Sequence, residues 1–274
     1  MQGLAHFVPT VVKVAYLNHL LQVGFDTLDF GSFVSPKAIP QLRDTAEVLT
    51  QLDLSETKTR LLAIVANLRG AFDACRFDQI RFLGYPLSVS ETFQQRNTNR
   101  SIAEAIGEVS QIQDLCGQAG KTLVVYLSMG FGNPYGDAYS PDMVAGFTQK
   151  LADLGIGIVA PSDTVGSATP ADISALFGTL IPDFPGIEFG AHLHSTPHEV
   201  EAKVAAAYRA GVRRIDGALR GYGGCPLATD DLTGNLPTEQ IVQWLETQGV
   251  DLQINKTALA DSLAYSTQVF SDVH

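Results

Sequence analysis

Two histidines with a single residue between them carry the clearest chemical signal in the sequence. His192 and His194 close the run Gly190–His194. Residues i and i+2 of a β-strand point to the same face, so the two imidazoles project together. Neutral imidazole nitrogens are common ligands of divalent metals. The spacing therefore predicts a metal site at the end of a strand, with a hydrogen-bonded histidine pair as the alternative.

Two aspartates stand within or directly after apolar runs. At the end of its run, Asp163 could bind a substrate hydroxyl or transfer a proton. A cap on the following turn is an equally good interpretation of Asp163. Asp29 interrupts the run that ends at Phe33, and a buried carboxylate needs a partner. We expect Asp29 to face a cation, a metal shell or hydroxyl groups, with structural pairing as the alternative.

A glycine-rich loop near the end of the chain holds a cysteine. Cys225 lies in Gly221–Pro226, and Gly234–Asn235 follows it. Glycines let a loop approach a ligand closely, so Cys225 is a candidate acid, base or nucleophile. The local sequence alone favours an ordinary turn with a buried thiol. Asn235 could offer a carbonyl oxygen to a hard metal ion, although an asparagine after glycine usually marks a turn.

The elements that must position these residues alternate regularly. Apolar runs rich in Val, Ile, Leu, Phe and Tyr predict seven strands, spaced by roughly 30 residues as in successive βαβ units. They are Phe25–Phe33, Leu61–Ala66, Ile80–Tyr85, Thr122–Met129, Ile156–Ser162, Ile187–His194 and Arg214–Tyr222. Helices are expected over Thr10–Gln22, after capping boxes at Ser101 and Thr196, and near Ala258–Val269.

This alternation predicts an α/β fold with a parallel sheet, either doubly wound or closed as a (β/α)8 TIM barrel. A Rossmann fold needs a GxGxxG turn after its first strand, and the sequence has none there, so we prefer the barrel. With seven strands visible, the missing unit would be the first strand, ahead of Met1. We expect residues 1–249 to form the barrel and residues 250–274 a helical extension packed on it.

Composition narrows the class of protein further. The chain has 274 residues, 45% of them hydrophobic, and a net charge of −11, which disfavours nucleic acid and anionic membranes as partners. We see no secretory signal, and no stretch approaches the about 18 apolar residues of a membrane span. Three well-separated cysteines suit a reducing compartment rather than a disulfide framework. We expect a soluble, cytoplasmic protein that acts on small molecules.

Several motifs together resemble those of the 3-hydroxy-3-methylglutaryl-CoA lyases of the DRE-TIM metallolyase superfamily. The matching segments, in the family's order, are Ser32–Lys37 with Pro40–Gln41, Ala66–Gly70, Asp163–Gly166, His192–His194 and Gly223–Pro226. Condensing relatives in the superfamily share the two histidines but generally lack the cysteine loop. The resemblance extends from Met1 to about residue 250.

The resemblance implies a TIM-barrel lyase that cleaves 3-hydroxy-3-methylglutaryl-CoA to acetyl-CoA and acetoacetate with Mg²⁺ or Mn²⁺. It also implies an acyl-CoA substrate, a homodimer and a role in leucine catabolism. It assigns His192, His194 and Asn235 to the metal, Cys225, Asp163 and Asp29 to catalysis, and Tyr126, Thr164 and Gln2 to substrate binding. Cys225 matches a loop cysteine of proton transfer, and Asp29 stands where the family usually has glutamate.

The motif that names the superfamily is expected at the end of the first strand, upstream of Met1. In the lyases it supplies an arginine that stabilises the enolate and an aspartate that binds the metal. Gln2 and Gly3 correspond to the residues just after it. Either the protein begins further upstream, which the other motifs favour, or this is a non-catalytic metal- or CoA-binding barrel. A related aldolase or acyl-CoA condensing enzyme is the third hypothesis, which the Cys225 loop disfavours.

Overall fold

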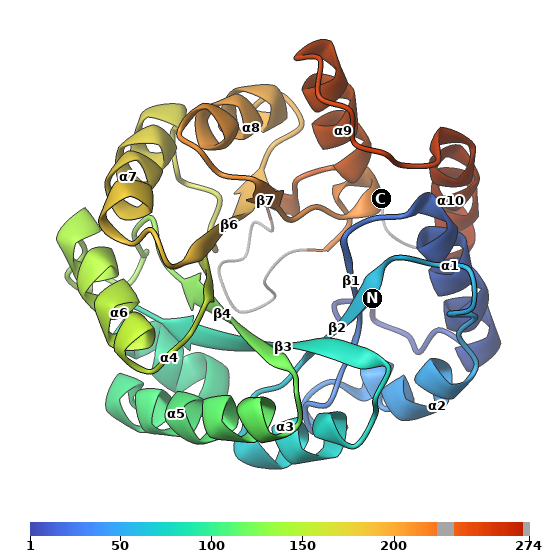
Figure 1. Ribbon diagram of the computed structural model, residues 1–274, viewed down its shortest axis with the longest axis horizontal. Helices are drawn as coiled ribbons and strands as arrows, with labels where there is room; N and C mark the ends of the chain where they lie inside the picture. The colour runs from blue at the N-terminus through green and yellow to red at the C-terminus, as the bar shows by residue number, and fades with distance from the viewer. Residues whose placement is uncertain (224–232, 271–274) are drawn as a thin grey trace.

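The computed structural model describes residues 1–223 and 233–270, and its strands form a curled parallel sheet (Figure 1). In chain order the strands are β1 (Thr27–Ser32), β2 (Arg60–Ile64), β3 (Ile80–Ser88), β4 (Thr122–Ser128), β5 (Ile158–Asp163), β6 (Glu188–Ser195) and β7 (Arg214–Ile215). Each strand pairs in parallel with the next, and β8 (Gly234–Asn235) pairs antiparallel with β6. The predicted barrel architecture with seven visible parallel strands is confirmed.

Helices cover the outer face of this sheet (Figure 1). They are α1 (Thr10–Val23), α2 (Thr45–Thr50), α3 (Leu68–Cys75), α4 (Glu91–Thr98), α5 (Ile102–Gln118), α6 (Pro141–Asp153), α7 (Pro170–Asp183), α8 (Val200–Arg209), α9 (Thr238–Thr247) and α10 (Lys256–Val269), with short 3-10 turns η1 (Pro40–Leu42) and η2 (Leu219–Gly221). Ser101 and Thr169 begin α5 and α7 with capping boxes, in which side chain and backbone satisfy each other's groups. No helix among these described residues is long and apolar enough to cross a membrane.

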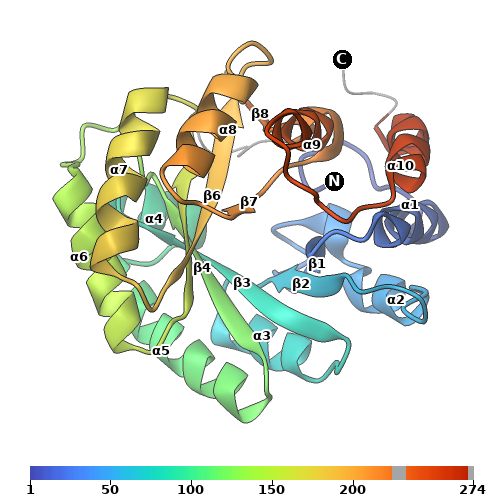
Figure 2. The ribbon, with the colours of Figure 1, turned by 45° about the horizontal axis from the view of Figure 1, so that its top comes forward.

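The last helix packs on the first one. Figure 2 shows α10 alongside α1, where the rings of Tyr16 and Tyr265 stack with centroids 6.4 Å apart. The backbone N–H of Asn255 donates to the carbonyl of Val23, so the entry to α10 is joined to the end of α1. The helix predicted near Ala258–Val269 is confirmed. The division of the chain into a barrel, 1–249, and an extension, 250–274, stays a prediction.

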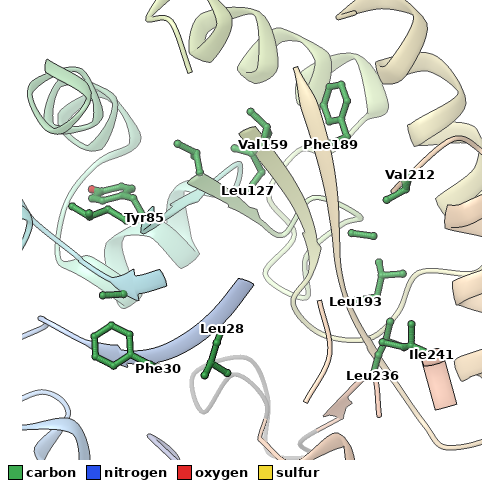
Figure 3. Close-up of a cluster of buried hydrophobic side chains, with 14 of the residues drawn as sticks. Leu28, Phe30, Tyr85, Leu127, Val159, Phe189, Leu193, Val212, Leu236 and Ile241 are labelled. Atoms are coloured by element: carbon green, nitrogen blue, oxygen red, sulfur yellow. The ribbon is translucent and has the colours of Figure 1, made fainter. Parts of the chain in front are cut away.

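Apolar side chains pack on both faces of the sheet. Leu127, Val159 and Phe189 lie between their strands and the surrounding helices (Figure 3). The opposite face carries a separate buried cluster inside the barrel, formed by Leu62, Phe82, Val124 and Ile158, with Ile64 and Tyr126 packed against it. Because strand residues alternate between faces, the same strands serve both layers. This interior cluster fills the barrel below the carboxyl ends of the strands, and we call it the interior floor.

Two predicted element boundaries are wrong. Strand β7 ends at Ile215 rather than Tyr222 because the chain turns away at Gly217, where a Cβ would lie 3.0 Å from the carbonyl of Leu236. Ala218 instead exchanges backbone hydrogen bonds with Leu236 and Thr238. Helix α8 begins at Val200 rather than directly at the capping box predicted at Thr196. The Thr196 hydroxyl nevertheless donates to the Glu199 carboxylate, 2.8 Å away.

We predict that Gly31→Ala lowers the free energy of unfolding by about 1–3 kcal/mol, as overpacking of a core does. The added methyl would lie 2.7 Å from the Thr45 side chain. Thr45 cannot move freely, because its hydroxyl accepts from the Ser32 N–H and donates to the Leu42 carbonyl. Urea unfolding measures the change. Gly107→Ala in α5, where the methyl meets nothing within 4 Å, is the control and should stabilise; equal behaviour of the two variants would contradict the packing argument.

Candidate functional site

The two predicted metal-binding histidines lie together near the carboxyl end of β6. Their ring centroids are 5.5 Å apart and their planes are tilted by 59°. His194 is 3% exposed, whereas the side chain of His192 is 34% exposed. Residues i and i+2 of β6 therefore share a face, as the spacing predicted, and one ring lies deeper than the other.

The environment of His194 keeps its imidazole neutral. Burial, and then the neighbouring His192, lower the pKa of His194 to about 3. The ring also forms a hydrogen bond with the backbone of Thr164. A hydrogen bond of this kind fixes one ring nitrogen and leaves the other as a metal ligand.

A carboxylate holds the other histidine. Nδ1 of His192 lies 3.2 Å from Oδ2 of Asp216, directly after β7. The edge of the same ring meets the ring of Tyr126 on β4, with centroids 5.4 Å apart and planes at 72°. A carboxylate that accepts from one ring nitrogen orients a histidine ligand and raises its basicity.

Asn235 joins the two histidines through the short strand β8. The antiparallel register sets Asn235 opposite His194. Its Nδ2 donates to the carbonyl of Tyr222 over 3.0 Å, which leaves the amide oxygen, Oδ1, as the group that a cation can use. The structure thus brings together all three predicted metal ligands.

This donor set fits a divalent cation. Two imidazole nitrogens and one amide oxygen suit Mg²⁺ or Mn²⁺ when water or substrate oxygens complete the shell. Within residues 1–223 and 233–270, no group of three His, Cys, Asp or Glu side chains could hold a metal by itself. Among these residues, the amide of Asn235 is the third donor that the sequence predicted.

Asp29 faces the barrel interior beside this site. It pairs with Leu62 of the interior floor in the β1–β2 register, and its side chain is exposed to solvent although the barrel wall encloses it. This enclosure, and the Asp216 carboxylate, raise the pKa of Asp29 to about 7. Burial, with Asp216 and Asp29, also raises the pKa of the Tyr126 phenol well above its usual value, so Tyr126 stays a neutral donor.

The Asp163 carboxylate is buried and paired within the protein, unlike a catalytic carboxylate that is free to contact a substrate. It is 1% exposed, accepts from the N–H of Ala168, and forms an ion pair with Lys203 at 3.1 Å. Burial raises its pKa, and Lys203 acts against that rise. Its contacts match the interpretation of Asp163 as a turn cap. The neighbouring Thr164 is also buried, and its hydroxyl accepts from the N–H of Met129 over 2.8 Å.

Gln2 and Cys225 are the remaining predicted site residues. Gln2 lies in an exposed turn ahead of α1. Cys225 lies outside the described residues. Both assignments stay predictions.

The sequence interpretation missed three charged residues around the site: Asp216, Lys203 and Arg214. Arg214 begins β7, with its stem against Gly190 and its guanidinium over the ring of Phe82, 5.7 Å from the centroid. Arg214 and Asp216 are two residues apart, so the spacing logic applied to the histidines could have found this pair. The helical spacing of Lys203 from Val200 and Ala207 could have marked it as facing inward.

Comparisons with known proteins place the chain in a family. Residues 1–264 match the HMGL-like family. The chain belongs to the HMGL-like family. A hydroxymethylglutaryl-CoA lyase of Bacillus subtilis is 32% identical over 93% of this chain and 84% of its own. An (R)-citramalyl-CoA lyase of Chloroflexus aurantiacus is 30% identical over 90% of this chain and 80% of its own.

A solved structure gives the same result. The HMG-CoA lyase of Acinetobacter baumannii, in complex with coenzyme A and 3-methylmalate, superposes with a TM-score of 0.90. It is 30% identical, over 98% of this chain and 87% of that one. Membership in the HMGL-like family confirms the predicted superfamily, the TIM barrel and the class of carbon–carbon lyase.

We predict that His194→Ala weakens Mn²⁺ binding by more than the roughly 10–100-fold that loss of an outer-shell partner causes. The variant removes a ligand that burial keeps neutral. Electron paramagnetic resonance of free Mn²⁺ during a titration measures the dissociation constant. His198→Ala, at an exposed position in the following turn, is the control and should bind as the unmodified protein does. An unchanged constant for His194→Ala would refute the assignment.

We predict that Asp216→Asn weakens Mn²⁺ binding about 10–100-fold while leaving the fold intact. The amide no longer offers His192 a charged acceptor, so the ring is oriented less firmly. The same titration, with urea unfolding beside it, separates affinity from stability. Asp183→Asn at the exposed end of α7 is the matched control. A drop in stability without a change in affinity would assign Asp216 to packing alone.

Proposed function

We propose that this protein is a divalent-metal-dependent lyase that cleaves 3-hydroxy-3-methylglutaryl-CoA to acetyl-CoA and acetoacetate. The arrangement of His192, His194 and Asn235 at one end of an HMGL-like barrel carries the proposal. The hydroxymethylglutaryl-CoA lyases among its relatives support the choice of substrate. We infer Mg²⁺ or Mn²⁺ as the metal from the nitrogen and oxygen donors.

The reaction is a retro-Claisen cleavage. A base removes the proton of the C3 hydroxyl, the oxygen electrons form the ketone of acetoacetate, and the C2–C3 bond breaks. Its electron pair becomes the enolate of acetyl-CoA, which then takes up one proton. A bound divalent ion would supply Lewis-acid stabilisation of the substrate oxygens.

Two residues of the barrel interior suit the proton transfers. Asp29 has a pKa raised to about 7, close to neutral pH, where a carboxyl group can both accept and release a proton. Its solvent-exposed position inside the barrel allows contact with a substrate. Tyr126, as a neutral phenol beside His192, can donate a hydrogen bond to a developing oxyanion. We propose Asp29 as the base and Tyr126 as the oxyanion donor.

A second substrate deserves the same test. The relative named (R)-citramalyl-CoA lyase is nearly as similar to this chain as the Bacillus subtilis protein is. Both substrate names describe branched CoA thioesters, and a lyase of either one can use the same site. A condensing enzyme and a non-catalytic barrel are the other candidates. A cytoplasmic location and a homodimer stay predictions.

We predict that the protein, assayed with Mn²⁺, releases acetoacetate from 3-hydroxy-3-methylglutaryl-CoA, and that Cys225→Ala removes most of this turnover while Mn²⁺ affinity stays nearly unchanged. The reason is that the resemblance assigns Cys225 to proton transfer and not to the metal. Coupled detection of acetoacetate gives the rate, for residues 1–274 and for a version that carries any residues encoded in frame ahead of Met1.

Other outcomes select the other candidates. Preferential cleavage of citramalyl-CoA would identify the second substrate. Release of CoA from acetyl-CoA and a keto acid would indicate a condensing enzyme. Tight Mn²⁺ binding without turnover by the extended version would support the non-catalytic barrel. Cys75→Ala, at a half-buried thiol that ends α3 and has no proposed role, controls for the loss of a sulfur and should leave turnover unchanged.

A further inference from the structure

Lys203 of α8 is completely buried, which is unusual for a lysine. Its Nζ donates to three oxygens: Oδ2 of Asp163 at 3.1 Å, the carbonyl of Gly166 at 2.9 Å and the carbonyl of His194 at 2.8 Å. An ammonium group has three protons, so all of them are used. Lys203 therefore has no donor left for a substrate, and its role must lie in what these contacts join.

The three acceptors belong to two segments of the candidate site. Asp163 ends β5 and begins the turn that contains Gly166, and His194 ends the predicted metal-binding run on β6. Strands β5 and β6 pair directly, up to Asp163 and Leu193. Lys203 therefore links the 163–166 turn to β6, just beyond the last paired residues of β5 and β6.

The same turn also orients the imidazole of His194. The ring of His194 forms a hydrogen bond with the backbone of Thr164, which follows Asp163 directly. The Thr164 hydroxyl in turn accepts from Met129 on the neighbouring loop. If the turn shifts relative to β6, this backbone partner shifts relative to the ring. Lys203 holds both sides of that contact, because it binds the turn and the backbone of His194 together.

Asp163 makes the burial of Lys203 possible. A buried ammonium without a counter-charge is strongly unfavourable, whereas a paired and fully hydrogen-bonded one is tolerated. Both oxygens of Asp163 also lie within 3.2 Å of the Ala168 N–H, so the carboxylate is satisfied on the protein side. These contacts leave Asp163 as a counter-ion and turn cap rather than a group that faces the substrate.

We propose that Lys203 is a positioning residue for the metal ligand His194, and that Asp163 is its buried counter-ion. Lys203 acts through the 163–166 turn, whose backbone fixes the His194 ring in one orientation. The proposal rests on the proposed metal site. It assigns to the Lys203–Asp163 pair a role in metal affinity as well as in stability.

The test replaces both charges at once, as Lys203→Met with Asp163→Asn, so that no unpaired buried charge remains. The matched control is Lys13→Met with Asp44→Asn. Lys13 of α1 is 1% exposed and pairs with Asp44, which directly precedes α2, so the two form a second buried lysine–aspartate pair on elements other than those of the histidines. Mn²⁺ titration gives the dissociation constant, and urea unfolding gives the stability of each protein.

We expect both double variants to lose stability, but only the Lys203–Asp163 variant to bind Mn²⁺ about tenfold or more weakly. A folded Lys203–Asp163 variant with the Mn²⁺ dissociation constant of the unmodified protein would overturn the proposal. Equal weakening in the control would overturn it too, since the effect would then follow stability. If the unmodified protein binds no Mn²⁺, the proposed function fails, and this is a separate result.

A measurement on the unmodified protein keeps the test valid if the double variant does not fold. Nitrogen-15 NMR of the imidazoles reports which ring nitrogen carries the proton and how fast that proton exchanges. We expect His194 to show one tautomer with a slowly exchanging N–H. A mixture of tautomers at His194 would show that the turn does not fix the ring, and the proposal would be wrong.

Discussion

The alternation of side chains along the strands of a curled parallel sheet is the constraint on which the rest of the structure depends. Every second residue faces the barrel interior, and parallel pairing brings the carboxyl ends of all strands to one rim. Low in the barrel these positions are apolar, as at Leu62 and Phe82. Towards the rim they become Tyr126 and His192, and Asp29 lies beside Leu62 in the β1–β2 register. The polar groups therefore gather near the carboxyl ends of the strands, where barrels of this kind bind their substrates.

Much of the fold could be predicted because parallel strands covered on both faces have nearly continuous apolar sequences. That signal located seven strands and, with hydroxyl caps and glycines between them, most helices. The apolar pattern did not predict the bounds of elements that depend on contacts between residues distant in sequence. Strand β7 stops at Ile215 because Gly217 packs against the carbonyl of Leu236. The two-residue strand β8 exists only because Asn235 meets His194, and no local pattern encodes such a pairing.

The candidate site could be predicted where its geometry is local. The i, i+2 spacing places His192 and His194 on one face whatever surrounds them. The residues that hold them are distant in sequence: Asp216 meets His192 across 24 residues, and Lys203 meets Asp163 across 40. The helical spacing of Lys203 from Val200 and Ala207 indicates that it faces inward, but it does not indicate which distant groups it meets. The same distance explains why Asp163, ambiguous in sequence, proves to be held by a buried ammonium.

The two histidines are held by different means, and the difference has a physical consequence. His194 is buried and bonds to backbone, so its ring can move only if β6 or the neighbouring turn moves. His192 is partly exposed and bonds to a carboxylate side chain, which can rotate about its own χ angles. One proposed ligand is therefore fixed by the fold, and the other can adjust. A metal that keeps its place while substrate and product oxygens exchange around it needs a rigid anchor and some freedom in the remaining shell. The buried contacts beneath His194 supply the anchor.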